Sequence, residues 1–362
     1  DPSAHFQIAT WTGNTSAPRS ITNDGNSNLQ PDIVWGKNRT SAGTDHELYD
    51  STRGTGTSYN LKPNSTVAEG ISTTYGQLTS FDTDGFTVNA GGTNDDFWNE
   101  NGSEFVAWQW KVNGGTTSSN TDGDLTSTVQ VNTTAGISIF TYTGKDPIEP
   151  LDIGHGLGSA PDFFVIKRRN GGSRNWGLYH HKMSDAPETD YLRWNSTNAV
   201  ADASTWWRDE APTSTVIKTG EQADVNQPND TFVGYAWKEV QGFSRFGRFI
   251  ANGAANGPYI HLGFKPAFII LRNVTNAGYN WWMLDNKRNT FNLTDEILYT
   301  NLSAAEFDGS GHASNMGVDF LSNGFKVRTT NTGINNNGGT TIYMAWAENP
   351  FVSSGGIPTT AR

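Results

Sequence analysis

The sequence predicts an all-β protein made of three internally repeated, antiparallel β-sandwich-like units, each with one short helical turn. Aromatic residues make up 12% of the 362 residues and, together with β-branched residues, favour strands. Gly, Asn, Ser and Thr fill the intervals between the apolar runs, which is typical of tight turns. Four landmarks then recur three times in the same order, and such self-similarity indicates one structural unit used repeatedly.

Each copy opens with two predicted strands. The first is an apolar strand that ends in a small turn, at residues 6–13, 137–144 and 246–253. The second is a run of β-branched and aromatic residues that follows a proline, at Pro31, Pro161 and Pro266. Proline has no N–H for the strand ladder, so it suits the first residue of a strand.

The third landmark is Leu-x-x-Asn followed by a hydroxyl residue and then by Ala and an acid. Its Asn, hydroxyl and acidic residues are Asn64, Thr66 and Glu69 in the first copy, Asn195, Thr197 and Asp202 in the second, and Asn301, Ser303 and Glu306 in the third. The second copy has two extra residues before the acid. Thr66-x-x-Glu69 and Ser303-x-x-Glu306 have the spacing of a capping box, in which the hydroxyl and the carboxylate bind free N–H groups at the start of a helix. This spacing predicts one short helical turn in each copy.

Each copy closes with a strand, at residues 105–108, 232–235 and 343–346. Trp108 and Trp346 in these strands are expected in the core by alternation. Before the closing strand, Asp84-Gly85-Phe86 and Asn323-Gly324-Phe325 predict hairpin turns, because Asp-Gly and Asn-Gly are strong hairpin signals. The second copy has no such turn near residues 213–216, so the equivalence of this hairpin across the copies stays open.

The landmarks divide the chain into three β repeats at residues 1–112, 135–243 and 244–352, with a linker at 113–134 and a C-terminal tail at 353–362. The linker prediction rests on Gly114-Gly115-Thr116-Thr117-Ser118-Ser119, which has linker composition. Each repeat is about 100 residues long, the size of a small domain. The sequence does not decide whether the repeats pack around a pseudo-threefold axis or sit in line.

Composition and charge exclude several classes of function. The formal net charge of −11 argues against nucleic-acid binding, which needs clustered Lys and Arg. The basic cluster Lys167-Arg168-Arg169 is expected to be a solvated strand end. No apolar run approaches the ~20 residues of a membrane span, and no signal peptide is visible. Cysteine is absent, which leaves stability to packing, and because Asp1 is not an initiator residue we expect that an upstream segment has been lost.

A set of motifs extends over nearly the whole chain. It comprises residues 1–6, 11–14, 30–39, 48–54, 79–86, 154–158, 343–351 and 358–362. In their order, these motifs resemble a repeat family of tailed-bacteriophage virion proteins, many of them from marine phages, which are usually labelled tail-fibre proteins. The resemblance implies a virion component on the tail or another external appendage and, by analogy with such proteins, a homotrimer. It supplies no established binding residues.

Candidate chemical motifs receive structural interpretations. The chain has no P-loop, Gly-x-Ser-x-Gly elbow or His-Glu-x-x-His motif. His180-His181 lies at a variable strand end without acidic ligands nearby, and His155 lies in a loop. Asn120-x-Asp122-x-Asp124 begins like a calcium loop but lacks its glycine and its glutamate. The sequence does not reveal whether two acids lie ~5 Å apart, as retaining glycosidases require, and we interpret four acids as loop residues, namely Glu149, Asp152, Glu210 and Glu221. The sequence therefore predicts no cofactor and no metal.

Two Trp pairs, Trp206-Trp207 and Trp281-Trp282, are the candidate ligand-binding residues. Adjacent residues in a strand point to opposite faces, so one Trp of each pair should leave the core. An exposed Trp beside polar groups suits a sugar ring or a partner protein. The competing interpretation is burial between neighbouring repeats or subunits.

These observations together favour a bacteriophage virion structural protein, a tail fibre or other external appendage, that attaches non-covalently to a host surface glycan or protein. Its expected partners are other virion proteins and copies of itself, with no nucleic acid and no membrane insertion, and it is not expected to be an enzyme. One alternative is a capsid decoration or head-fibre protein without a receptor. A polysaccharide depolymerase is less favoured, because no acidic cluster recurs among the three copies.

Overall fold

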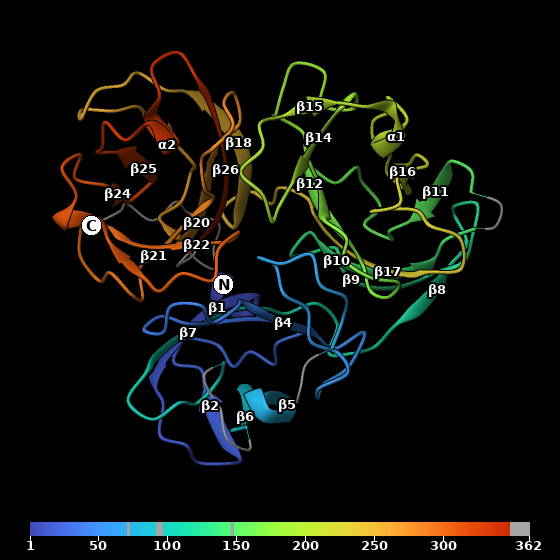
Figure 1. The fold of residues 1–362 in the computed structure, drawn as a ribbon, viewed down its shortest axis with the longest axis horizontal. Helices are drawn as coiled ribbons and strands as arrows, with labels where there is room; N and C mark the ends of the chain where they lie inside the picture. The colour runs from blue at the N-terminus through green and yellow to red at the C-terminus, as the bar shows by residue number, and fades with distance from the viewer. Residues whose placement is uncertain (71–72, 92–96, 146–147, 348–362) are drawn as a thin grey trace.

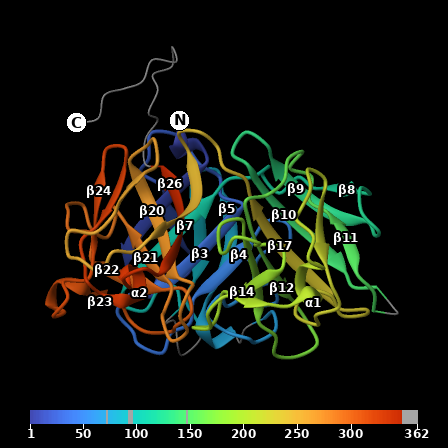
Figure 2. The ribbon, with the colours of Figure 1, turned by 90° about the horizontal axis from the view of Figure 1, so that it is seen from above.

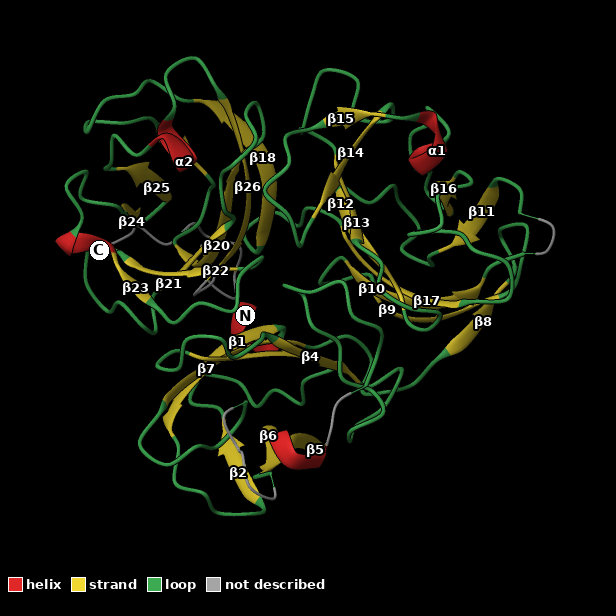
Figure 3. Cartoon of the chain, in the orientation of Figure 1, coloured by secondary structure: helices red, strands yellow, loops and turns green. Residues whose placement is uncertain are grey.

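A computed structural model describes residues 1–70, 73–91, 97–145 and 148–347. Strands account for 41% of the chain and helical turns for 5%, which confirms the predicted all-β class. The strands form antiparallel sheets in three lobes (Figure 1), and the few short helical turns lie outside the main sheets (Figure 3). The end of the third predicted repeat, 348–352, and the predicted tail, 353–362, lie outside the described residues.

The first lobe is β-sandwich-like, with two sheets that share one apolar cluster. Its larger sheet has the order β1 (Phe6–Thr12), β7 (Glu104–Trp110), β3 (Ile33–Asn38), β4 (Glu47–Asp50). Its smaller sheet has the order β2 (Arg19–Thr22), β6 (Gly85–Asn89), β5 (Gln77–Asp82), and short 3-10 turns occur at Pro2–Ala4 and Thr73–Tyr75. Val34 of the larger sheet and Phe86 of the smaller one are buried in the same cluster.

The second lobe contains the largest sheet. Its order is β15 (Ala201–Asp202), β14 (Asp190–Arg193), β13 (Trp176–His180), β12 (Phe163–Arg168), β17 (Thr231–Trp237), β10 (Ile137–Thr143), β9 (Ser127–Asn132), β8 (Ser118–Asn120). The remaining elements are β11 (Leu151–Gly154), which pairs with β16 (Val216–Thr219), and the helical turn α1 (Ser204–Trp207). The segment 113–134, predicted as a linker, thus supplies β8 and β9, which extend the sheet beyond β10.

The third lobe again has two sheets around a shared cluster. The larger sheet has the order β18 (Ser244–Ile250), β26 (Thr340–Ala347), β20 (Pro266–Asn273), β21 (Trp282–Asp285), β22 (Glu296–Tyr299), β23 (Phe307–Asp308). The smaller sheet has the order β19 (Tyr259–His261), β25 (Gly324–Val327), β24 (Val318–Leu321), and the turns are α2 (Thr332–Asn335) and a 3-10 turn at Gly309–Gly311. Leu271 and Phe325, one from each sheet, lie in the same cluster.

The three main sheets share a strand order at their centres: β1-β7-β3-β4, β10-β17-β12-β13 and β18-β26-β20-β21. They also share a register, because the residue two positions after each landmark proline pairs with a Trp of the closing strand. These pairs are Ile33 with Trp110, Phe163 with Trp237, and Phe268 with Trp346. The predicted alignment of the third closing strand with the first was therefore wrong by two residues, because Trp346 takes the position of Trp110 and not that of Trp108.

The inner faces of the three main sheets meet in one apolar core. Trp110, Trp237 and Trp346 contact one another edge to face there, with ring centroids 5.4 to 6.2 Å apart. All three rings are buried, as is Trp108, so the predicted core position of Trp108 and Trp346 is confirmed. The first lobe lies below the other two in Figure 1, and the second and third lobes lie on opposite sides in the view from above (Figure 2). The lobes therefore surround a common centre and are not arranged in line.

The lobes meet at three seams that use the same backbone hydrogen bonds. The N–H groups of Gly43, Arg174 and Gly278 donate to the carbonyls of Ser303, Thr66 and Thr197, respectively. The N–H groups of Glu306, Glu69 and Val200 donate to the carbonyls of Arg39, Arg169 and Val274. The contacts thus run from first to third lobe, from third to second and from second to first, which closes a ring.

These seams explain the third landmark and correct its interpretation. No helix begins at Thr66 or Ser303, so the predicted capping boxes are wrong. The hydroxyl residue instead contributes its carbonyl to a seam, and the acid contributes its N–H and its carboxylate. In the second lobe the seam position is Val200 and not Asp202, so an apolar residue stands there in place of the acid.

The basic cluster is also placed differently from the prediction. Lys167 and Arg168 are buried, and the guanidinium of Arg169 forms an ion pair with Glu69 across a seam. The Lys167 ammonium donates to the carbonyls of Thr66 and Arg174, at 3.0 and 2.6 Å. Burial lowers the pKa of Lys167 to about 7. Lys167 and Arg169 are therefore part of the contact between the first and second lobes, Arg168 pairs with Asp230 inside the second lobe, and the prediction of a solvated strand end is wrong.

Candidate functional site

The third lobe contains a cavity of about 310 Å³ whose wall combines aromatic rings and amides. Its lining includes Tyr279, Trp282, Tyr299, Phe307, His312, Asn280 and Asn331. Cavities of this size and composition are typical of small-molecule sites, in which rings give contact area and a few polar groups give orientation. We call it the third-lobe cavity.

Strand pairing brings the aromatic rings together. Trp282, at the start of β21, and Tyr299, at the end of β22, are direct cross-strand partners, and such partners have neighbouring side chains on one face of the sheet. Phe307 begins β23, the next strand of the same sheet. The ring of His312 then lies edge to face with that of Phe307, at 6.1 Å between centroids. The sheet edge thus forms one continuous aromatic wall.

The polar groups of the third-lobe cavity are fixed in place but retain free donors. The Asn280 amide oxygen accepts from Asn301 Nδ2 at 2.9 Å, and the Asn331 amide oxygen accepts from the N–H of Gly333 at 2.8 Å. His312 Nδ1 accepts from the N–H of Ser314 at 3.2 Å, which leaves Nε2 to donate. In the described part of the chain, the amide nitrogens of Asn280 and Asn331 make no hydrogen bond. The cavity therefore offers donors that are already oriented.

The first lobe has a cavity in the corresponding place, of about 330 Å³, with different chemistry. It is lined by Asp45, Lys62, Tyr75 and Phe97, among others. Asp45 Oδ2 accepts from Lys62 Nζ at 2.8 Å, and that ammonium lies 5.0 Å from the centre of the Phe97 ring. The wall of this first-lobe cavity therefore carries an internal ion pair whose ammonium lies over an aromatic face.

The same pair of hydrogen bonds occurs at these places in all three lobes. The side-chain oxygen of the landmark Asn accepts a backbone N–H hydrogen bond in each lobe. The pairs are Asn64 with His46, Asn195 with Trp176, and Asn301 with Trp281, and each donor lies four positions before the last residue of β4, β13 or β21. Each also donates from Nδ2 to a side-chain oxygen, of Asp45, Asn175 and Asn280, respectively. In the second lobe, Trp206 stacks on Tyr191 at 4.3 Å, and the Arg193 guanidinium lies over both rings. Asp45 and Lys62 of the first lobe thus correspond to Asn280 and Tyr299 of the third.

Comparison with known proteins places the chain in a family. A family model described as a domain of unknown function (DUF7483) matches residues 1–350. The chain belongs to the DUF7483 family. No curated protein and no solved structure matches it. The description of the DUF7483 family assigns it no activity.

The four predicted site residues of this DUF7483 chain are all buried, with relative exposures of 2% or less. The expectation that one Trp of each pair leaves the core is therefore corrected. Trp206 and Trp207 lie in the helical turn α1, where strand alternation does not apply. Trp281 stacks on Trp194 of the second lobe, at 5.4 Å, and its indole N–H donates to the carbonyl of Ser196. Trp281 thus fits the competing interpretation, burial between neighbouring units, and Trp282 alone among the four lines the third-lobe cavity.

The histidines occupy packed positions. His180 is buried, lies within hydrogen-bond distance of the Tyr343 carbonyl at 3.3 Å, and burial lowers its pKa to about 3. The Nδ1 of His181 lies 3.0 Å from Asp162 Oδ1, so the expectation that no acid lies near the His pair is wrong. His155 is buried as well, and burial lowers its pKa to about 4. Across the described residues, no group of three or more His, Cys, Asp or Glu side chains could hold a metal ion.

Three of the four acids interpreted as loop residues form ion pairs, and the loop interpretation is wrong for Asp152, which lies in β11. Asp152 and Glu210 both contact Arg208 and Lys218. Glu149 pairs with Lys145 at the surface.

Among the described residues, no helix is both long and apolar enough to span a bilayer.

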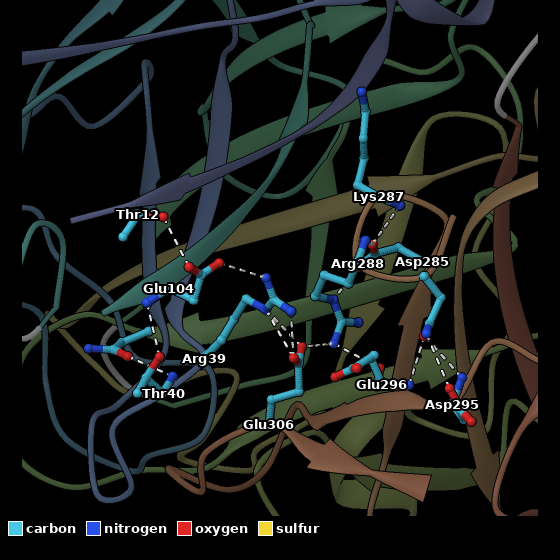
Figure 4. Close-up of polar contacts among 12 residues, drawn as sticks. Thr12, Arg39, Thr40, Glu104, Asp285, Lys287, Arg288, Asp295, Glu296 and Glu306 are labelled. Carbon is cyan, nitrogen blue, oxygen red and sulfur yellow. Dashed lines mark hydrogen bonds and ion pairs between the residues drawn. The ribbon is translucent and has the colours of Figure 1, made fainter. Parts of the chain in front are cut away.

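The carboxyl groups of Glu296 and Glu306 form a pair at the seam between the first and third lobes (Figure 4). The hydrogen bond to Glu306, together with burial, raises the pKa of Glu296 to about 7. Burial alone would raise the pKa of Glu306, but hydrogen bonds from Arg39 and the charge of Arg288 outweigh it and lower the pKa to about 2. Divergent pKa values are typical of acid–base pairs, yet neither residue lines the cavities described above. The pair is therefore better explained as part of the seam.

Sequence reasoning missed the other residues of the third-lobe cavity, above all Asn280, Tyr299 and Asn331. A signal was present in the repeats. Tyr299 stands two residues before the landmark Asn301, where the first copy has Lys62 before Asn64. Comparison of side chains at matched offsets would have revealed the exchange of a charged residue for a neutral aromatic one.

Proposed function

We propose that this chain is an external component of a bacteriophage virion, a tail fibre or other appendage, that attaches non-covalently to a host surface. The observation that carries the proposal is the third-lobe cavity, which joins aromatic faces to oriented amide donors, the groups that bind a ligand without reacting with it. The resemblance of the motifs over nearly the whole chain to tail-fibre proteins supplies the virion context.

We also propose that the three lobes are copies of one unit. The shared strand order, the shared register and the three matching seams support this relation. So does a correlated exchange across the seams. Arg39 meets Glu306 and Arg169 meets Glu69, but Val274 meets Val200, so that the cation and the acid change together.

The proposed partners are other virion proteins and further copies of this chain, with a homotrimer as the proposed assembly. Several copies on one particle would raise the avidity of a weak individual site through effective concentration. A site of modest affinity is therefore compatible with firm attachment of the whole particle.

The location is tested by labelling intact virions with a gold-conjugated antibody against this chain and viewing them by electron microscopy. Label on the tail or its fibres is expected. Label over the head would favour the alternative of a capsid decoration or head fibre, and label on no particle would refute the virion proposal. Binding of the purified, fluorescent chain to host cells tests attachment separately, and absence of binding would refute the receptor role.

A further inference from the structure

We propose that the third-lobe cavity binds an uncharged sugar ring, and that its selectivity arises because its wall lacks the Asp–Lys ion pair that lines the first-lobe cavity. This inference rests on the proposed attachment function and names the chemical class of the ligand. Three features of the cavity carry it, namely the aromatic wall, the free donors and the missing charges.

The aromatic wall suits the apolar face of a pyranose. Such a face carries several C–H groups that pack against an aromatic ring, while the hydroxyls at the rim need polar partners. Tyr299 and Phe307, which are partly exposed, provide the accessible part of this surface, and the buried ring of Trp282 lies behind Tyr299 in the same sheet. The volume of about 310 Å³ lies at the lower end of the range for small-ligand sites, which fits one or two sugar rings better than a large ligand.

The free donors match the hydroxyls of a sugar. The amide nitrogens of Asn280 and Asn331 and the Nε2 of His312 are available, and the remaining atom of each side chain is anchored by a hydrogen bond. The hydroxyl of Tyr299 can donate or accept, and burial raises the pKa of this phenol, so it stays protonated at neutral pH. Anchored donors lose little rotational freedom on binding, which favours affinity.

The missing charges argue against an ionic ligand. In the first lobe, Asp45 supplies a carboxylate and Lys62 an ammonium, and the two neutralise each other. The third lobe keeps the hydrogen bond from the landmark Asn but has Asn280 in place of the acid and Tyr299 in place of the cation. Among the described residues that line the third-lobe cavity there is no Lys, Arg, Asp or Glu, so an anionic sugar would meet no permanent cation and a cationic group would meet no carboxylate. Burial of an unpaired charge is costly, whereas a neutral ring avoids that cost.

The repeats provide a matched pair of variants for the test. The double variant Asn280→Asp with Tyr299→Lys installs the first-lobe ion pair in the third-lobe cavity. The control, Asp45→Asn with Lys62→Tyr, makes the reciprocal change in the first lobe. Circular dichroism and thermal unfolding verify that both chains fold. Binding is measured by titration calorimetry with the full chain against methyl glycosides of glucose, galactose and mannose, N-acetylglucosamine, glucuronate, glucosamine and choline.

We expect at least one neutral sugar to bind, with affinity at least tenfold weaker in the third-lobe variant and unchanged or stronger in the control. Preference for choline or glucosamine would indicate an aromatic cage for a cation and would overturn the inference, as would preference for glucuronate. Equal loss in both variants, or no binding of any neutral sugar, would also overturn it.

The outcome is separable from that of the proposed function. If the purified chain binds host cells and the third-lobe variant binds them equally well, attachment stands and the cavity inference fails. If neutral sugars bind but the purified chain does not bind host cells and the antibody labels no virion, the cavity inference stands and the attachment function fails.

Discussion

The carboxylate of Glu306 lies between two guanidinium groups at the seam of the first and third lobes (Figure 4). Its Oε1 is 2.6 Å from Arg39 Nη2, and its Oε2 is 2.7 Å from Arg288 Nη1. The Arg288 side chain is fully buried and Glu306 nearly so. Glu69 has the same arrangement at another seam, where it pairs with Arg53 and Arg169. A buried pair of this kind contributes most visibly when one partner is removed.

Glu306→Gln should therefore destabilise the protein strongly. The neutral amide leaves the Arg288 guanidinium with less compensation in a buried site, at a cost of about 3–5 kcal/mol. Urea unfolding measures the loss. The control is Glu104→Gln, which removes a half-exposed partner of the same Arg39 and should change stability by less than ~1 kcal/mol. Equal effects of the two substitutions would contradict the role assigned to Glu306.

Glu296 should make stability fall as the pH rises towards 8. Its folded-state pKa of about 7 lies above its ordinary value of 4.5, because of the hydrogen bond to Glu306 and burial. The folded state therefore binds more protons between these two values, and this contribution is present below pH 4.5 and lost as the pH passes 7. Urea midpoints of the wild type and of Glu296→Gln, compared at pH 5, 6, 7 and 8, isolate this contribution from that of the buried histidines. Identical pH profiles of the two proteins would refute it.

At the scale of elements, the two hairpins illustrate what the sequence predicts well. Asp84-Gly85-Phe86 and Asn323-Gly324-Phe325 lie at the β5–β6 and β24–β25 turns, as expected. The glycine also has a packing role that the turn signal does not reveal. A Cβ atom on Gly85 or Gly324 would lie 2.0 Å from the carbonyl oxygen of Ile21 or Ile260, in the strand on the other side.

Gly324→Ala should consequently force β19 and β25 apart. Overpacking of a tight site costs about 1–3 kcal/mol and sometimes more, so the midpoint of thermal unfolding should fall by several degrees. Gly311→Ala is the matched control in the same lobe, because a Cβ there meets nothing within 4 Å. Equal midpoints for the two variants would show that the strands can accommodate the methyl group.

Strands and hairpins were predictable because their signals are local. The landmark prolines, the apolar runs and the Gly turns act over a few residues, and Pro266 does begin β20. The acids at Glu69 and Glu306 were recognised as a pattern but misinterpreted, because capping-box spacing is local whereas their arginine partners come from distant segments. The candidate site was predicted only through Trp282, since the rest of its wall is assembled by strand pairing and by a helical turn. The burial of Trp206 and Trp207 was missed because a helical turn replaces the expected strand, and that of Trp281 because its neighbour Trp194 belongs to another lobe.

At the scale of the whole molecule, the lobes share one core although two of them also have cores of their own. Clusters between the paired sheets lie inside the first and third lobes. The central cluster instead joins residues of all three lobes, among them Trp110, Trp237 and Trp346. The sequence left open whether the units form a ring or a line, because both arrangements are compatible with the same pattern of apolar residues in the strands. The inner faces, apolar in every lobe, are buried only in the ring.

The shared core predicts that the three lobes unfold together. Trp110→Ala should remove edge-to-face contacts with both other lobes. It should lower the free energy of unfolding by about 3–5 kcal/mol, as is usual when a buried Trp is truncated. The control is Phe291→Ala, at a side chain that is 85% exposed, which should lower it by less than ~0.5 kcal/mol. In the wild type, calorimetric and van't Hoff enthalpies should agree, as they do for a single cooperative transition. If unfolding instead separates into steps and Trp110→Ala shifts only one of them, the lobes are independent domains. The ring would then fix where the lobes lie without coupling their unfolding.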